Sequence, residues 1–578
     1  MSAVRTQLAM LAALVVLGGL AACTPPAPVG PLPPLPRAAY ARYLGGKLAA
    51  YQGDWAAAAD ALAEAAAAAP DQPMIAVELA RAQMKAKRSA AALATLAAAR
   101  TRWPAHPQVW LVSGDLLAAG DPAEASHAYL RAIQLSPDDE RAYLGLAKLQ
   151  KAAAAETTLR ILIAHVPASV DGHYRLAVRF AMRGELASST RELRAVLERD
   201  PDHIDARLDL ARALRRQGHL DQAIAETRSA FDRSGQALDI AEELFWLLCE
   251  ADDRGAAIDL LTLLDDDRSD ADALAVIARL DRGLGRIAEA RTIAQRIAVI
   301  DHDAGAIALA EIQLAVGDRA AVQATLAAID DEGRLAGDAH RLSAEAALAA
   351  GDPAAALATL APLAARDAHA GPPDAPDPAA LDAGKPRRSL DRALVQAFAL
   401  AELGKLSEAR AALAPFGPVG DPAGHPGVTM ARARLAEHAG DTAAALALLD
   451  PLIRAKPDVV AALNLAGYLL ADANQRLGDA ERYLRHARDL APGEPEILDS
   501  WGWLLLRRGA PRAAVRALDR AARFAPLEPE ILVHLAAAWA ADGAPRTAAE
   551  ALDRAAALGP TPAVQKRIAA MRQTLPAR

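Results

Sequence analysis

The sequence predicts an all-α protein, a solenoid of about fifteen stacked pairs of short helices. The first observation is the spacing of apolar residues in residues 492–526, which is three or four throughout, as in amphipathic helices. These residues fall into two groups, Leu498, Trp501 and Leu505 and then Ala514, Leu518 and Ala521. Gly509 and Pro511 separate the groups and Pro526 follows the second, so the stretch predicts two helices joined by a turn.

The second observation is that this stretch repeats. A shift of 34 residues superimposes seven positions: Trp501 on Leu535, Gly502 on Ala536, Gly509 on Gly543, Ala514 on Ala548, Leu518 on Leu552, Ala521 on Ala555 and Pro526 on Pro560. This period and the helix–turn–helix content resemble the tetratricopeptide repeat. Gly502 and Ala514 lie where that repeat requires small side chains, because its two helices approach closely there.

The third observation is compositional. Aromatic residues make up 4% of the 578 residues and hydrophobic residues 53%, and no sustained run has the period of two that is typical of strands. The 64 basic and 72 acidic residues give a net charge of −8, so no general basic field is expected to hold a phosphate backbone. Nucleic acid is therefore not an expected partner.

Residues 1–22 read as a secretory signal peptide, with one basic residue, Arg5, before an apolar run at residues 8–20. The tetrapeptide Leu20-Ala21-Ala22-Cys23 resembles the lipobox of bacterial lipoproteins, in which the cysteine is acylated and becomes the mature N-terminus. The alternative is a chance cysteine beside an ordinary cleavage site. Thr24 after the cysteine implies, by the sorting habit of that family, residence in the outer membrane on its periplasmic face.

Residues 23–38 form a proline-rich tether, either stiff polyproline II or plainly disordered. The main array is expected at residues 39–366. Prolines that end its early repeats are spaced by 33, 30 and 34 residues, which predicts one shortened unit, at Pro104, Pro137, Pro167 and Pro201. Between residues 236 and 366 the register slips, and four degenerate units are expected with turns marked by Gly255, Gly285, Gly317 and Gly351.

Residues 367–388 are rich in proline, glycine and aspartate and predict a loop that divides the array. The C-terminal repeats are expected at residues 389–560, with a second break at residues 414–426. Residues 561–578 are expected to form a capping helix and tail, with Val564, Ile568 and Met571 on the packed face.

No catalytic motif, metal site or cofactor site is expected, and an enzyme is the least favoured class. The thirteen histidines are scattered, mostly beside turns. The acidic groups at residues 265–267 and 301–303 follow helix ends and read as solvated turns. Cys249, once Cys23 is acylated, has no partner for an intramolecular disulfide and is expected to be a buried, inert thiol rather than a reactive one.

The inner face of such a superhelix is lined by the first helix of each pair. Asn464 and Tyr468 correspond to Asp499 and Trp503 one repeat later, and each pair is spaced by four residues, so its members share a face. These four residues are the candidate partner-binding patch, because an exposed aromatic beside polar groups fits the composition of interface hot spots. The alternative is that Trp503 fills the groove between adjacent repeats.

The lipobox, the tether, the repeats and two C-terminal blocks, L-N-L-A-G-Y-L-L-A-D at residues 463–472 and I-L-D-S-W-G-W-L-L-L-R-R-G at residues 497–509, together resemble a family of proteobacterial outer-membrane lipoproteins. The resemblance implies a lipid-anchored adaptor that binds a periplasmic carboxyl-terminal processing protease and presents cell-wall hydrolases to it. The alternative is a structural scaffold for exopolysaccharide export or outer-membrane assembly.

Overall fold

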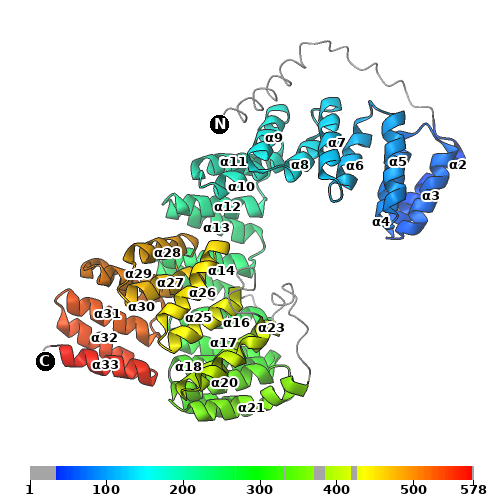
Figure 1. The fold of residues 1–578 in the computed structure, drawn as a ribbon. Coiled ribbons are helices and arrows are strands. Elements are labelled where there is room, and N and C mark those ends of the chain that lie inside the picture. The colour runs from blue at the N-terminus through cyan, green and yellow to red at the C-terminus, as the bar shows by residue number, and fades with distance from the viewer. Residues whose placement is uncertain are drawn as a thin grey trace. The chain divides into compact units, whose positions relative to one another are not determined.

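A computed structural model describes residues 34–266, 269–330, 333–369, 385–417, 426–491 and 493–575. Within these ranges the chain forms 31 α-helices and one short 3-10 helix, without a β-strand (Figure 1). The predicted all-α solenoid is confirmed. The chain divides into two compact units, residues 1–217 and residues 218–578.

Unit 1 is built of antiparallel helix pairs. Its helices are α2 (Arg37–Tyr51), α3 (Trp55–Ala68), α4 (Pro73–Lys85), α5 (Ser89–Arg102), α6 (Pro107–Leu117), α7 (Pro122–Leu135), α8 (Glu140–Leu149), α9 (Ala152–His165), α10 (Val170–Met182), α11 (Leu186–Arg199) and α12 (Ile204–Arg216). The shortened unit that the proline spacing predicts is the pair α8 and α9, in which α8 has only 10 residues.

Unit 2 contains the remaining helices. They are α13 (Leu220–Arg233), α14 (Leu238–Glu250), α15 (Arg254–Asp266), α16 (Ala271–Gly283), α17 (Ile287–Ile300), α18 (His302–Ala315), α19 (Arg319–Leu326), α20 (Ala336–Ala349), α21 (Pro353–His369), α23 (Lys385–Glu402), α24 (Leu406–Ala412), η1 (Ala414–Phe416), α25 (Pro426–His438), α26 (Thr442–Ala455), α27 (Val460–Asp472), α28 (Leu477–Leu490), α29 (Pro495–Arg507), α30 (Pro511–Phe524), α31 (Pro529–Ala541), α32 (Pro545–Ala557) and α33 (Pro562–Thr574).

The helices begin and end at residues that the sequence marks. Asp54, Asp121 and Asp441 each precede a second helix and accept a hydrogen bond from the backbone N–H three residues later. The helices α29 to α33 each carry proline in the first turn, where a missing N–H leaves no bond unmade. Gly509 and Gly543 form turns at φ of +76° and +83°, which glycine adopts without the steric penalty of a side chain.

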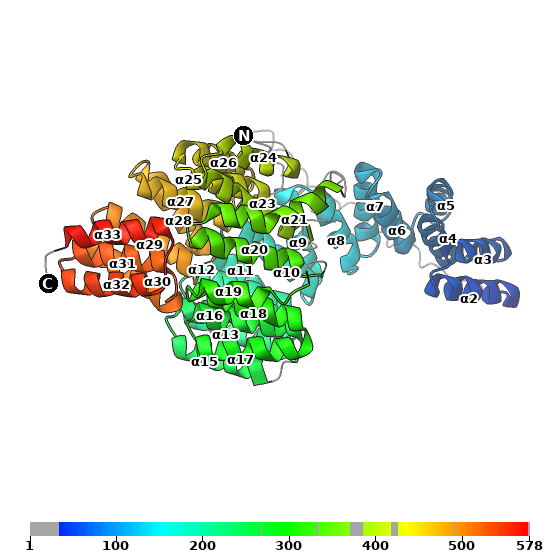
Figure 2. The same ribbon diagram turned by 90° about the horizontal axis from the view of Figure 1, so that it is seen from below.

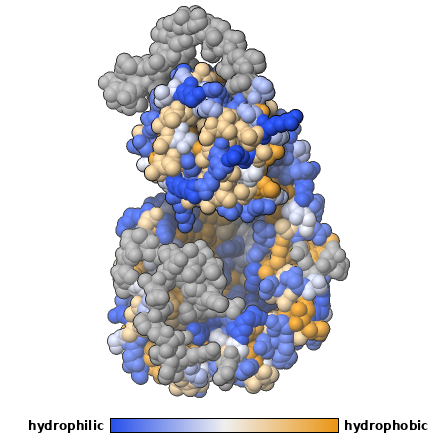
Figure 3. All heavy atoms as spheres, turned by 90° about the vertical axis from the view of Figure 1, so that its right-hand side faces the viewer, coloured by the Kyte–Doolittle hydropathy of each residue, from blue (hydrophilic) through white to orange (hydrophobic). Residues whose placement is uncertain are grey.

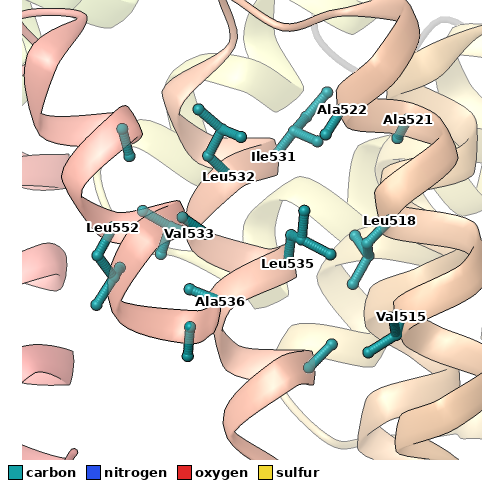
Figure 4. Packing of buried hydrophobic residues seen from close by; sticks show 14 of the residues in the cluster. Val515, Leu518, Ala521, Ala522, Ile531, Leu532, Val533, Leu535, Ala536 and Leu552 are labelled. Atoms are coloured by element: carbon teal, nitrogen blue, oxygen red, sulfur yellow. The ribbon is translucent and has the colours of Figure 1, made fainter. Parts of the chain in front are cut away.

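The helices of a pair lie close together because one of them carries a small residue at the crossing. A Cβ atom on Gly502 would lie 2.5 Å from Cγ of Leu518, and one on Gly46 would lie 2.6 Å from Cγ of Leu62. Ala514 is fully buried in the same hydrophobic cluster as Leu518, part of which Figure 4 shows. The predicted need for small side chains at Gly502 and Ala514 is therefore confirmed by the packing.

The degenerate stretch between residues 236 and 366 does form four pairs, α14 to α21. Both ends of the predicted loop at residues 367–388 are helical, because α21 continues to His369 and α23 already begins at Lys385. The flanking residues are mostly good helix formers, and Pro386 lies in the first turn of α23, where proline is tolerated. Residues 370–384, and residues 418–425 of the second break, lie outside the described residues.

Helices that are far apart in the sequence also meet within unit 2. The Arg520 guanidinium on α30 donates to the carbonyl oxygen of Cys249 at 2.8 Å, and Arg523 pairs with Asp252 at 2.9 Å. Cys249 lies in the last turn of α14, and Asp252 lies in the connection between α14 and α15. The sequence pattern did not predict these contacts, since a repeat register describes only neighbours along the chain.

Candidate functional site

The predicted patch lies on the first helices of the C-terminal repeats. The helices α27, α29, α31 and α33 run side by side, each packing on the next (Figures 1 and 2). Their side chains meet in one group, which we call the His534 cluster and which comprises Tyr468, Asp472, Asp499, Trp503, Arg507, His534 and Arg567.

A linear chain of hydrogen bonds crosses three of these helices. His534 on α31 has 1% of its side chain exposed, and its Nδ1 lies 2.9 Å from both carboxylate oxygens of Asp499 on α29. Its Nε2 lies 2.9 Å from Nη2 of Arg567 on α33. A guanidinium group has only donors, so Nε2 accepts and the ring proton must lie on Nδ1, from which it is donated to Asp499. The imidazole is therefore held at both nitrogens.

Two aromatic rings pack around this imidazole. Trp503 stacks on His534 with ring centroids 4.3 Å apart and planes 26° apart, and the Tyr468 ring lies 6.0 Å away. The indole Nε1 of Trp503 donates to Asp472 at 3.1 Å. The Arg507 guanidinium lies 5.1 Å from the Trp503 ring centre and donates to the carbonyl oxygen of Asp472. Stacking, the cation–π contact and the hydrogen bonds thus fix the Trp503 ring from several directions.

Three of the four predicted residues converge on His534, and the fourth does not. Tyr468, Asp499 and Trp503 contact or flank it, as described above. Asn464 lies one turn before Tyr468 on α27, and no donor among the described residues reaches its buried Oδ1. Asp499 is only 8% exposed and gives both oxygens to His534, so it positions the imidazole instead of facing a partner.

Trp503 has features of both roles suggested by the sequence, which are partner binding and filling of the groove between adjacent repeats. It packs against the hydrophobic cluster that contains Leu470 and Leu504, and so fills space between adjacent first helices. It nevertheless remains only partly buried and keeps part of its ring at the surface. Its role in binding a partner stays a prediction.

Sequence reasoning missed His534 and Arg567. A shift of 34 residues places Asp499 over Val533, whereas the contact is made with the next residue along. The sequence did contain a signal for His534. Asn464, Asp499 and His534 are polar residues inside mainly apolar helices, and they are spaced equally, by 35 residues. His534 also differs from the expected histidine beside a turn, because it lies within α31 and is buried.

Carboxylates surround the cluster on its neighbouring helices. Burial raises the pKa of Glu437 on α25 to about 7, although Arg434 opposes this shift, and the carboxylates of Glu530 and Asp472 raise the pKa further. Burial also raises the pKa of the Tyr468 phenol, and Asp472 adds to this effect. Burial and nearby carboxylates therefore favour the neutral form of both groups.

The Asp499–His534 pair resembles two members of a catalytic triad, but its geometry favours a structural role. A general base needs a free imidazole nitrogen, and here Nε2 already accepts from Arg567. Together with Arg567, the pair instead links two successive repeats to the capping helix and positions Trp503, which leaves a preformed surface of aromatic and charged groups.

The other residues and segments singled out in the sequence lie outside the His534 cluster. Cys249 is fully buried, as predicted, and burial raises the pKa of its thiol to about 12, which disfavours the reactive thiolate. Cys23 and the rest of residues 1–33 lie outside the described residues. Across the described ranges, no helix combines the length and apolar character of a membrane span. In the same ranges, no group of three or more potential metal ligands comes together.

Comparisons with known proteins agree with the repeat architecture. Two family profiles, both described as the tetratricopeptide repeat, match residues 49–113 and 181–243, and residues 113–150, 430–495 and 500–561, about half of the chain in all. Over 90 residues the chain is 41% identical to a TPR repeat-containing protein of Pseudomonas aeruginosa. That match covers 16% of this chain and 15% of the relative, so the chain spans only a small part of its length.

Solved structures with similar helical repeats have low identity to the chain. A tetratricopeptide repeat protein from Parabacteroides merdae is 16% identical, with 39% of this chain and 92% of that chain covered and a TM-score of 0.29. A chain of the APC/C hetero-tetramer Cut9–Hcn1 is 13% identical, with 93% and 96% covered and a TM-score of 0.29. From the matched repeats, the chain belongs to the family of tetratricopeptide-repeat proteins.

Proposed function

We propose that the protein is a lipid-anchored platform that binds other proteins at the bacterial outer membrane. Tetratricopeptide repeats generally mediate protein–protein interactions, and arrays of them are typical of interaction proteins rather than of enzymes. The observation that carries the proposal is the His534 cluster, in which buried bonds hold a partly exposed Trp503 beside Arg507 and Asp472. Partly exposed tryptophan and arginine in fixed positions are the residue types that dominate binding energy at protein interfaces.

The sharper form of the proposal is an adaptor. It binds a periplasmic processing protease and that protease's cell-wall-hydrolase substrates, as the C-terminal sequence blocks imply, and acylated Cys23 holds it at the membrane. Two proteins held on one array meet at an effective concentration in the millimolar range when the connections are short, so a slow encounter becomes fast without new chemistry. No cofactor is needed for such a role.

The test is reconstitution with the processing protease of the same organism and one of its hydrolase substrates. The full-length protein is expected to have no hydrolytic activity alone and to accelerate degradation of the hydrolase severalfold. Trp503→Ala is expected to weaken capture of one partner, because it removes the exposed aromatic of the cluster.

A matched control exists in unit 1. Trp110 on α6 is also partly buried, lies beside a histidine, His127, at 5.9 Å, and carries an arginine, Arg100, 5.7 Å from its ring centre. Trp110→Ala should leave capture unchanged if the His534 cluster is the binding surface. If the full-length protein neither bound nor stimulated the protease and instead co-purified with export or assembly components from detergent-solubilised membranes, the adaptor role would be replaced by the scaffold role.

A further inference from the structure

The first described helix, α2, is apolar on two faces. One face carries Ala39 and Gly46, which are fully buried or packed against α3. A second stripe of large side chains is open to solvent, with 52%, 47%, 58% and 90% exposed at Tyr40, Leu44, Leu48 and Tyr51. Their spacing of four, four and three residues places all of them along one side of the helix.

An interior repeat buries the two central positions of the stripe. When Gly46 is aligned with Gly502, Leu44 corresponds to Ser500 and Leu48 to Leu504. Ser500 is 4% exposed and Leu504 is fully buried, because an interior first helix packs against the preceding repeat, whereas the positions that match Tyr40 and Tyr51 are exposed. A preceding layer would therefore cover the centre of the stripe, at Leu44 and Leu48.

The C-terminal end of the array, unlike the N-terminal helix α2, is covered by a helix with a mainly polar outer face. The helix α33 buries Val564 and Ile568 against the last pair and presents mainly polar and charged side chains outward. Terminal repeats of a solenoid usually need such a polar outer face to remain soluble. The apolar outer face of α2 departs from this rule.

The charges on α2 indicate what could cover the stripe. The helix carries Arg37, Arg42 and Lys47 and has no acidic residue, although the whole chain has a net charge of −8. Arg42 lies on the packed side of α2, where it pairs with Glu64 on α3. Arg37 and Lys47 lie along the stripe, and Lys47 also pairs with Glu78 on α4 at 2.8 Å. In the space-filling view that turns the right-hand side of Figure 1 toward the viewer, apolar residues lie open between hydrophilic ones on these N-terminal helices (Figure 3).

We propose that the exposed stripe of α2 docks on an anionic lipid surface. Basic residues beside exposed leucines, with tyrosines at both ends of the stripe, are the composition of helices that lie in a membrane interface. A second copy of α2 is a poorer occupant, because the Arg37 guanidinium of each helix would meet the basic residues of the other, while Glu64 and Glu78 are already paired. The inference rests on the proposed anchor in one respect: only 13 residues lie between Cys23 and Arg37, so lipidation would keep α2 close to the bilayer.

The experiment places an environment-sensitive fluorophore on the stripe. Full-length protein carrying Leu48→Cys is labelled with a nitrobenzoxadiazole maleimide, since Cys249 is buried and acylated Cys23 has no free thiol. The matched control is Val299→Cys on α17, which is 89% exposed and lies far from α2 in the sequence. Each protein is mixed with vesicles of phosphatidylglycerol and phosphatidylcholine, or of phosphatidylcholine alone, and its flotation with the vesicles is recorded.

A blue shift and a severalfold rise in emission at position 48 with phosphatidylglycerol vesicles are expected, without a change at position 299. Leu44→Ser in the same labelled protein should abolish most of the shift. Protein that floats with the vesicles while the label at position 48 stays in water would overturn the inference and leave the anchor standing.

Two further outcomes would also overturn the inference. A shift that occurs without vesicles and disappears on dilution would show that a second copy covers the stripe. A shift without vesicles that survives dilution would show that residues before α2 cover it. Partner capture is measured separately on the Trp503 variants, so failure of the adaptor role and failure of lipid docking are distinguishable.

Discussion

Replacing His534 by alanine tests whether the buried chain of hydrogen bonds holds the C-terminal repeats together. The substitution removes the donor to Asp499, the acceptor for Arg567 and the ring on which Trp503 stacks. Asp499, only 8% exposed, is then left without the donor that bonds both of its oxygens.

The expected loss follows from these contacts. A hydrogen bond to a charged group contributes about 1.5–3 kcal/mol, and an aromatic stack about 0.5–1.5 kcal/mol. Leaving the buried Asp499 carboxylate without this donor costs about 1–3 kcal/mol or more, a value that already includes the lost hydrogen bond. We therefore expect His534→Ala to lower the local free energy of unfolding by about 2–4 kcal/mol.

Amide hydrogen exchange followed by mass spectrometry is the suitable assay, because a solenoid can open locally and the loss should be confined to α29–α33 and their neighbours. The control is His486→Ala, since His486 also lies beside an aspartate, Asp458, at 3.0 Å, but the two side chains are 39% and 73% exposed. An exposed pair contributes about 0–1 kcal/mol. Equal increases in amide exchange for the two variants would refute the conclusion that the hydrogen bonds of His534 hold the C-terminal repeats together.

Two further predictions use other features of the same structure. Gly45 and Gly46 are adjacent in α2, but a Cβ on Gly45 meets nothing within 4 Å, whereas one on Gly46 would press on Leu62. Gly45→Ala should therefore stabilise α2 by about 0.5–1 kcal/mol and Gly46→Ala should destabilise it by about 1–3 kcal/mol, as read from exchange of the α2 and α3 amides. Burial raises the pKa of Glu437 from an ordinary 4.5 to about 7, so the folded protein holds this proton more tightly than the unfolded chain does. Between those pH values, the free energy of unfolding of the wild type should fall as pH rises, relative to that of Glu437→Gln. The expected fall is roughly 1–3 kcal/mol, at about 1.4 kcal/mol per pKa unit. Urea melts of both proteins would measure this difference, and parallel pH profiles would contradict the raised pKa.

The repeat architecture could be predicted from the sequence because it is specified locally. The period of apolar residues, the glycine turns and the prolines each act within one helix pair or between neighbouring pairs. Three of the four expected turn glycines in the degenerate stretch, Gly285, Gly317 and Gly351, do adopt a positive φ, and the stretch forms four pairs. Gly255 was wrongly expected in a turn: it lies in the first turn of α15, and the positive φ falls at Asp252. The boundaries of the predicted loop at residues 367–388 were less accurate, since composition alone does not show how far α21 and α23 extend into it.

The candidate site was predictable only in part, because its centre depends on a side chain from a third helix. Tyr468, Asp499 and Trp503 were placed on one surface by their repeat positions. His534 joins them through a contact one residue out of the repeat register, and Arg567 comes from the capping helix, where no register applies. Burial of Asp499 could not be read from its type, since aspartate is rarely buried without a partner.

The departures from the repeat pattern in unit 2 have a physical explanation in its long-range contacts. In the degenerate units, turn glycines lie against the C-terminal repeats: a Cβ on Gly285 would lie 2.7 Å from Pro526, and one on Gly317 would lie 2.5 Å from the carbonyl oxygen of Leu558. Glycine is required there both for its positive φ and for the close approach of another segment. Pro526 lies in the connection that leads into α31, and Leu558 lies in the connection that leads into α33. The helices α31 and α33 carry His534 and Arg567. The repeats that present Trp503 are therefore supported by a second set of contacts, and a surface held in this way loses little conformational entropy when a partner binds.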